Sequence, residues 1–303
     1  MIEKEFRNED PTGKAITLIL FVVSLIGAGS LSVKIGLQGF PPLKMALFRS
    51  MLGILVVGGV GFYFGVSMRL RFEELPRLLL LAALQALHII TMNVGTQFTT
   101  ASRSTICHTL YPIFVVLFGH FWLPGDRLSP TKLLGILAAF GGMFVALAPN
   151  LQGTGAAEHL IGDLIVTLSA CLLAFRITFT KLFVQEIYPY RLLVWLLGIS
   201  IPIFFVLSYI FEREKSIVWT LASSGALLYQ GWVITGFCFL ALTWVLRKYK
   251  ASKLVVFSFL MPVSGVLFSN MFLGDALTFS LLAGTGLVAT GIYLVNMQPK
   301  KAQ

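Results

Sequence analysis

Charged residues are scarce in this sequence, and their scarcity decides the broad class of protein. Of the 303 residues, 12% are charged and 57% are hydrophobic, and the mean hydropathy is +0.87. Soluble domains contain roughly 25% charged and 45–50% apolar residues. The composition therefore excludes an ordinary soluble fold and predicts a protein that lies in a lipid bilayer.

Acidic residues are fewer still, which leaves an excess of positive charge. The chain has 13 Asp and Glu against 23 Lys and Arg, a net charge of +10. Binding of nucleic acid would require these cations to share one continuous surface. They occur instead in short clusters between apolar runs, so we expect no nucleic-acid partner.

Cysteine is also rare. Cys107, Cys171 and Cys238 lie in apolar stretches, at spacings unlike those of metal ligands. They are predicted to be small buried side chains rather than disulfide partners or ligands. The sequence contains no phosphate-binding loop and no nucleophile motif. We therefore expect no cofactor and no metal site.

Long apolar runs dominate the chain. A membrane helix needs about 20 mostly apolar residues, and ten such segments are predicted at 15–37, 43–66, 77–98, 103–123, 131–149, 160–183, 190–211, 222–246, 252–273 and 278–297. The expected fold is an all-α integral membrane protein of about ten transmembrane helices. Hydrophilic tails, at 1–14 and 298–303, precede and follow it.

Positive charge accumulates in alternate breaks between the segments. Clusters of Lys and Arg occur at 4–14, 69–77, 127–132, 181–191, 247–253 and 300–301, whereas 150–162 and 274–280 contain none. Cytoplasmic loops are enriched in Lys and Arg, so both termini are predicted to be cytoplasmic. No signal peptide is expected, because the leading segment is charged and the first apolar run is long enough to span.

The second half of the chain repeats motifs of the first. Gly-Asp-Arg-Leu at 125–128 returns as Gly-Asp-Ala-Leu at 274–277, 149 positions later. Ala-Ser-Arg at 101–103 returns as Ala-Ser-Lys at 251–253, 150 positions later. The offset predicts two repeats of five helices each, at 15–149 and 160–297.

A repeat with an odd number of helices must place its second copy upside down in the membrane. Inverted repeats of this kind are a recurring plan of secondary transporters, whose solute site lies between the halves near the bilayer midplane. Two alternatives remain open. An integral-membrane enzyme acting on a lipid-like substrate is expected to cluster acidic residues or histidines near one interface, and a channel more often uses symmetry among subunits. The pattern favours a transporter and argues against an enzyme.

The repeated motifs carry a resemblance to a known family. With Thr100, Pro112 and Pro262, they resemble the drug/metabolite transporter superfamily and, within it, the bacterial EamA family. The family often has Glu where this sequence has Asp126 and Asp275. The resemblance implies a ten-helix permease of the bacterial cytoplasmic (inner) membrane for amino acids, other metabolites or drug-like molecules. A homodimer is left open.

Carboxylates fall at expected helix ends, in loops or in the N-terminal tail, and none lies in the middle of an apolar run. This argues against a carrier driven by protonation of a buried carboxylate. The groups in the apolar runs that titrate near neutral pH are His88 and His108. Facilitated diffusion or exchange is therefore slightly favoured over proton coupling.

The third segment has a polar face, which includes His88, Asn93 and Gln97 at helical spacing. Such a face should turn toward the bundle interior or a wet cavity. Two interpretations are equally weighted: a substrate-binding surface, or hydrogen bonds that only hold helices together.

The fourth segment carries His108, Tyr111 and Pro112, and the ninth carries the equivalent Pro262. Proline interrupts backbone hydrogen bonding and kinks a helix, so the two prolines are candidate gating positions. Tyr111 is a candidate substrate contact, with Trp232 and Met261 of the second half as the partner surface.

Arg49 and Arg176 lie well inside apolar segments. Both are able to snorkel to the membrane surface, but an inward Arg49 would bind a carboxylate or phosphate and favour an anionic or zwitterionic solute. Cations nearer the helix ends are predicted to snorkel. These are Lys34, Arg103, Lys181 and Lys253.

Overall fold

The computed structural model describes residues 11–122, 130–147, 156–249, 254 and 256–296. Within these ranges, seven helical stretches are long and apolar enough to cross a membrane, and three shorter apolar helices accompany them. The predicted all-α fold of ten crossings is confirmed. Predicted features at 125–128 and 251–253 lie outside the described residues.

Each predicted segment corresponds to one crossing, and several crossings are broken into two or three helical pieces. In the first half the elements are α1 (Gly13–Gly27) with α2 (Gly29–Gly36), α3 (Pro42–Tyr63), η1 (Phe72–Glu74) with α4 (Leu75–Phe98), α5 (Ala101–His108) with α6 (Tyr111–Trp122), and α7 (Pro130–Leu147). In the second half they are α8 (Ala156–Phe183), α9 (Pro189–Phe211), α10 (Leu221–Leu228) with η3 (Tyr229–Cys238) and α11 (Phe239–Lys248), η4 (Val256–Phe259) with α13 (Leu260–Leu273), and α14 (Phe279–Asn296).

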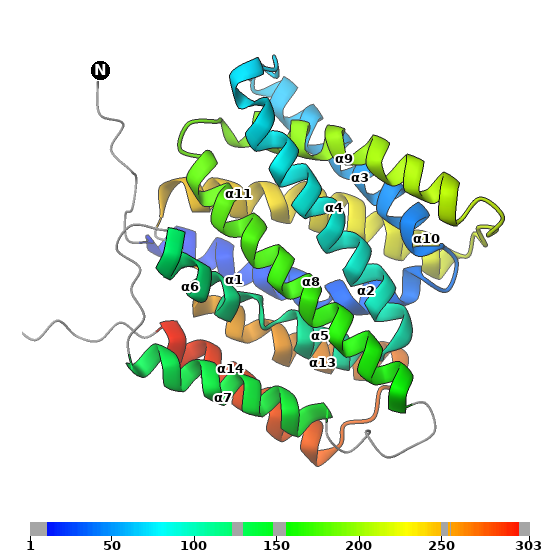
Figure 1. The fold of residues 1–303 in the computed structure, drawn as a ribbon, viewed down its shortest axis with the longest axis vertical. Helices are drawn as coiled ribbons and strands as arrows, with labels where there is room; N and C mark the ends of the chain where they lie inside the picture. Colours follow the sequence, from blue (N-terminus) through cyan, green and yellow to red (C-terminus); the bar gives the residue numbers. More distant parts are fainter. Residues whose placement is uncertain (1–10, 123–129, 148–155, 250–253, 255, 297–303) are drawn as a thin grey trace, which may run out of the picture.

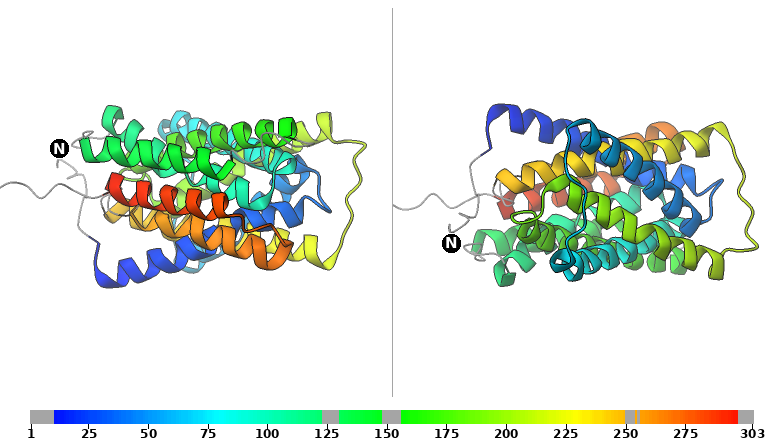
Figure 2. Two further views of the ribbon diagram at one scale, coloured as in Figure 1. Left: turned by 90° about the horizontal axis from the view of Figure 1, so that it is seen from below. Right: turned by 90° about the horizontal axis from the view of Figure 1, so that it is seen from above.

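The crossings run side by side, so that their ends form two faces of the bundle (Figure 2). The N-terminal face carries the start of α1. The opposite face carries the connection 212–220 between α9 and α10. Consecutive crossings run in alternate directions between these faces, as a chain of short connections requires (Figure 1).

The pair α7 and α14 displays the inverted repeat directly. A Cβ placed on Gly142 would lie 2.7 Å from the carbonyl oxygen of Gly284, and one on Gly291 would lie 2.5 Å from that of Gly135. The repeat offset of 149 relates the two contacts, because Gly142 in the first half corresponds to Gly291 in the second, and Gly135 corresponds to Gly284. The two helices therefore cross about an axis that exchanges the halves, with glycine at each point where the backbones meet.

Two lysines provide a second pair of equivalent contacts. Lys34 Nζ donates to the carbonyl oxygen of Thr96 at 3.0 Å, at the end of α4. Lys181 Nζ donates to the carbonyl oxygen of Leu246 at 2.9 Å, at the end of α11. The donors are 147 positions apart and the acceptors 150 apart, so each half has a lysine that binds the end of its own third crossing.

The snorkelling predicted for Lys181 is therefore wrong, because its side chain is 2% exposed, whereas Lys34 remains partly exposed at the end of α4. The last carbonyls of a helix have no intrahelical donor, and they carry the negative end of the helix dipole. A neighbouring ammonium group satisfies them and so has a reason to turn inward. Lys253, also predicted to snorkel, lies outside the described residues.

Both predicted gating prolines lie where the α-helical hydrogen bonding changes. Pro112 is the second residue of α6, directly after the break that follows His108. Pro262 is the third residue of α13, directly after the 3₁₀ turn η4. Each proline lacks the N–H that a continuous helix would use at this point.

Candidate functional site

A cavity lies at the centre of the bundle, between crossings of both halves, and its volume is about 130 Å³. This is small beside the roughly 300–1,000 Å³ of pockets for drug-sized ligands, so the space suits a small solute. Most of the wall is apolar. Its polar side chains are Ser30, Arg49, His88, Thr105, His108, Thr109, Tyr111, Arg176, Thr180, Gln230, Thr243 and Ser258.

Two arginines from different halves face this cavity. Arg49, of α3, is 3% exposed, and Arg176, of α8, is 7% exposed. Among the residues that the structure describes, those that line the cavity include no Asp and no Glu. The cavity is consequently electropositive, with apolar walls that screen the charges little.

The Arg49 side chain is held by a threonine of the eighth crossing. Its Nε and Nη2 donate to Thr235 Oγ1 at 3.1 Å and 2.9 Å. Thr235 lies in η3, a π-helical segment, and its hydroxyl donates to the carbonyl oxygen of Gln230 at 2.8 Å. Because that bond uses the hydroxyl hydrogen, the oxygen lone pairs are left to accept from Arg49.

Arg176 has weaker support. Its guanidinium carbon lies 4.8 Å from the centre of the Phe239 ring, a cation–π contact. Its Nε is buried, and it has no acceptor among the residues that the structure describes. Burial of a guanidinium group with an N–H that no acceptor binds lowers the stability of the fold, unless a further partner accepts that hydrogen bond.

A histidine pair connects the third and fourth crossings. Nε2 of His88 lies 3.3 Å from Nε2 of His108, and the ring centres are 5.6 Å apart. A hydrogen bond between the two rings requires one Nε2 to donate and the other to accept. Both rings line the cavity.

Tyr111 joins the two crossings that contain Pro112 and Pro262, the equivalent prolines of the two repeats. Its hydroxyl lies 3.0 Å from Ser258 Oγ and 3.6 Å from Met261 Sδ. Pro112 follows Tyr111, and Pro262 follows Met261. The contact therefore spans the two halves beside both interruptions of the helices.

Five of the residues predicted from the sequence to contact the solute meet at the cavity. They are Arg49, His88, His108, Tyr111 and Met261. Asn93 lies elsewhere, since its Nδ2 donates to the carbonyl oxygen of Pro42 at 2.9 Å and so supports the start of α3. Gln97 is exposed at the end of α4, and Trp232 is 49% exposed on the outer surface.

Several lining residues were not singled out by the sequence. Arg176 was noted as a cation in an apolar run, but nothing separated an inward position from snorkelling. Gln230 and the small hydroxyl side chains, such as Thr109, give no signal, because serine and threonine occur throughout membrane helices. Within η3, Gln230 lines the cavity, and Trp232, two residues later, faces out.

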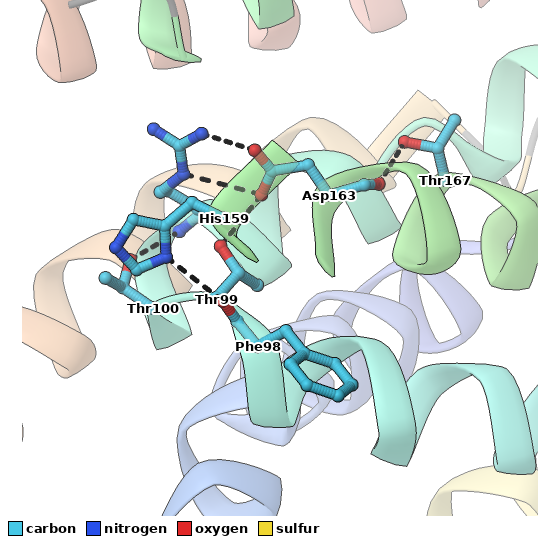
Figure 3. Close-up of polar contacts among 7 residues, drawn as sticks. Phe98, Thr99, Thr100, His159, Asp163 and Thr167 are labelled. Atoms are coloured by element: carbon cyan, nitrogen blue, oxygen red, sulfur yellow. Dashed lines mark hydrogen bonds and ion pairs between the residues drawn. The ribbon is translucent and has the colours of Figure 1, made fainter. Parts of the chain in front are cut away.

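A buried ion pair lies beyond the cavity, near the opposite face, and Figure 3 shows the polar contacts around it. Arg103 of α5 pairs with Asp163 of α8, and their side chains are 3% and 4% exposed. Thr99 Oγ1 donates to Asp163 Oδ1 at 2.8 Å, and His159 Nδ1 lies 3.1 Å from the carbonyl oxygen of Phe98. This cluster ties the α4–α5 connection to α8.

The cluster corrects two expectations. Arg103, predicted to snorkel, is buried against Asp163. Asp163, placed by sequence near a helix end, lies two turns inside α8 and is 3% exposed. Each charge is tolerated because the other is present and hydrogen bonds surround the pair.

With this geometry in place, comparison with known proteins decides the family. Residues 13–148 and 160–297 each match the model of the EamA-like transporter family. The chain belongs to the EamA-like transporter family. It is accordingly a multi-pass membrane transporter, and the family is not one of enzymes. The resemblance noted from the sequence motifs is confirmed, and the two matches coincide with the two repeats.

Named relatives agree with this assignment. An uncharacterized transporter of Bacillus subtilis, YoaV, is 25% identical over 93% of this chain and 96% of its own. A probable amino-acid metabolite efflux pump of Escherichia coli is 26% identical over 91% of this chain and 93% of its own. A solved crystal structure shares the fold with a TM-score of 0.72 at 17% identity, covering 93% of this chain and 98% of that one.

Proposed function

We propose that this transporter moves a small amphipathic metabolite by alternating access, and that the solute binds in the central cavity. One observation carries the proposal: the cavity lies between the two inverted halves and combines an apolar wall with a few placed polar groups. The site lies within one chain, so the proposal needs no second copy.

Ion pairs between the halves support a gate at each face. Arg103 pairs with Asp163 at the opposite face. At the N-terminal face, Arg191 pairs with Glu74 at 2.6 Å and Arg77 pairs with Glu186. Each pair joins one residue from each half.

Rocking of the halves breaks contacts at one face while those at the other persist, as alternating access requires. Kinks at Pro112 and Pro262 beside the Tyr111 contact give the rocking a place to bend.

The chemistry of the wall supports an amphipathic solute. Apolar side chains make up most of the surface, and His88, His108, Tyr111 and Gln230 offer hydrogen bonds. Two of the relatives, from Escherichia coli and Salmonella typhimurium, are named as probable amino-acid metabolite efflux pumps. A metabolite related to amino acids therefore fits both the cavity and the family.

The orientation that we propose places both termini, and the N-terminal face, in the cytoplasm, because the Lys and Arg clusters at 69–77 and 181–191 lie at connections on that face. Cysteine substitution tests it. In a Cys-free background, Ser216→Cys, at an exposed position of the 212–220 connection, should react with an impermeant thiol reagent added to whole cells. Ser67→Cys, at an exposed position of the N-terminal face, should react only after lysis. The reverse pattern would refute the orientation.

Modification of the cavity wall tests the site itself. Thr109 lines the cavity and donates to the carbonyl oxygen of Ile106 at 3.0 Å. Thr290 makes the same kind of bond, to Gly286 at 2.8 Å, but faces outward on α14. In the Cys-free protein, a small permeant thiol reagent should abolish transport by the Thr109→Cys variant and leave the Thr290→Cys variant active.

The substrate would be found first, by screening metabolites for uptake into proteoliposomes. Excess substrate should then protect Thr109→Cys from the reagent, because solute and reagent compete for one space. Full transport by the modified Thr109→Cys protein would remove the cavity as the binding site while leaving the family assignment intact.

A further inference from the structure

Arg49 and Arg176 approach the cavity from opposite membrane faces. Arg49 lies seven residues after Pro42, the end of α3 at the opposite face, and Arg176 lies seven residues before Phe183, the end of α8 at the N-terminal face. At 1.5 Å per residue, each is about 10 Å from its own face. Because both line one cavity, the two charges bracket its middle.

The cavity supplies little compensation for these charges. Arg49 has the neutral hydroxyl of Thr235, Arg176 has the Phe239 ring, and Nε of Arg176 has no acceptor among the described residues. The described part of the lining contains no carboxylate. Elsewhere in the bundle, buried Arg103 is paired with Asp163. Buried cations of a membrane protein are ordinarily paired in this way. Arg49 and Arg176 thus lack the kind of carboxylate partner that Arg103 has.

We propose that the solute is a small organic anion whose acid group binds between Arg49 and Arg176 and whose apolar part lies against the cavity wall. This proposal rests on the cavity being the transport site. A carboxylate offers two oxygens that match guanidinium donors. The apolar part faces Ile26, Leu173 and Met261.

The same argument disfavours a zwitterionic amino acid. Its carboxylate would bind between the two arginines. Its ammonium group would find no carboxylate among the described lining residues and would lie close to two fixed positive charges. Neutral acceptors, such as the Tyr111 and Ser258 hydroxyls, compensate an ammonium only weakly. Deaminated relatives of amino acids, such as branched carboxylic acids, satisfy the cavity better.

Three compounds with one branched carbon skeleton test this. Isovalerate carries a carboxylate, isovaleramide carries none, and valine adds an ammonium group. The thermal midpoint of the purified full-length transporter would be measured with each, at ionic strength balanced by sodium chloride. Isovalerate should raise the midpoint, because a ligand that binds the folded state stabilises it, and the other two should raise it much less.

Three results overturn the proposal. They are stabilisation by isovaleramide or valine equal to that by isovalerate, no stabilisation by isovalerate, and an effect that chloride alone reproduces in full. The last would indicate a halide site in place of a site for an organic anion.

Charge removal gives an independent measurement. Arg49→Gln and Arg176→Gln should each weaken isovalerate binding by about a hundredfold. Each should also raise the midpoint of the ligand-free protein, because an uncompensated buried charge is gone. An arginine with only a structural role would give the opposite, a lower midpoint. Arg213→Gln removes an exposed charge over the Tyr209 ring and should change neither quantity.

The charge-preserving variants Arg49→Lys and Arg176→Lys keep the proposal testable if the glutamine variants fail to fold. They should retain partial binding, and full binding in both would count against bidentate recognition by the guanidinium groups.

Failure here is distinguishable from failure of the proposed function. If modified Thr109→Cys loses transport of a substrate that is neutral or zwitterionic, the cavity remains the site and the anion proposal is wrong. If isovalerate binds through both arginines but modification leaves transport intact, the anion site is real and the transport site lies elsewhere.

Discussion

Asp163→Ala should destabilise the transporter by about 3–5 kcal/mol, because it leaves buried Arg103 without its paired carboxylate. It also removes the acceptor of the Thr99 hydroxyl at 2.8 Å. Unfolding would be followed by the thermal midpoint in detergent. Glu158→Ala is the control, since Glu158 is an exposed carboxylate near the start of the same helix, and it should change stability by no more than a few tenths of a kcal/mol.

A double-mutant cycle separates the ion pair from its surroundings. Adding Arg103→Met to Asp163→Ala should recover much of the loss, because neutral side chains of similar size replace buried ion pairs at small cost. If the two single changes prove additive, or if Asp163→Ala costs no more than Glu158→Ala, then the pair does not hold the opposite face together.

The fold was predictable because its signals are local. Twenty-residue apolar runs fix the number of crossings, and the Gly-Asp motifs at 125–128 and 274–277 fix the repeat. The odd number of helices in each repeat then requires inversion. None of these steps depends on which helices are neighbours.

The site was predictable in part, for a reason visible in α4. His88 and Asn93 belong to one polar face in sequence, but the face meets different neighbours along its length. Near its middle it borders the cavity at His88, and five residues later it meets the start of α3, where Asn93 binds the Pro42 carbonyl. The two interpretations weighed from sequence, cavity surface and helix contact, thus apply to different parts of one face.

Trp232 shows a second limit. It was expected in the partner surface because its large aromatic side chain would supply apolar area to a cavity. An aromatic side chain is equally at home on the outer, lipid-facing side of a membrane helix, and Trp232 is 49% exposed there. Residue type alone therefore does not tell which side of this crossing faces inward.

The buried cations show a third limit. Snorkelling is the sound expectation for a lysine or arginine near a helix end. For Arg103 and Lys181 the competing partners, Asp163 and the Leu246 carbonyl, are 60 and 65 positions away in sequence. Tertiary packing alone brings them together, and a single sequence carries no pattern for it.

Gly284→Leu should cost about 1–3 kcal/mol or more, and Gly286→Leu, on the same helix, should cost little. A Cβ at Gly284 would lie 2.5 Å from the Gly142 carbonyl oxygen and 2.6 Å from the Ala146 nitrogen, both backbone atoms that cannot move aside. A Cβ at Gly286 meets nothing within 4 Å, since this residue faces outward. Leucine is also the better helix former, which favours the control variant further.

A third variant tests the same contact from α7, the partner helix in the inverted repeat. Gly142→Leu reaches the other side of the same crossing, where a Cβ would lie 2.7 Å from the Gly284 carbonyl oxygen, so its loss should be similar to that of Gly284→Leu. Folded yield and thermal midpoint in detergent would be measured for all three variants. If Gly286→Leu proved as harmful as Gly284→Leu, helix propensity or insertion would explain the losses, and close contact between α7 and α14 would not.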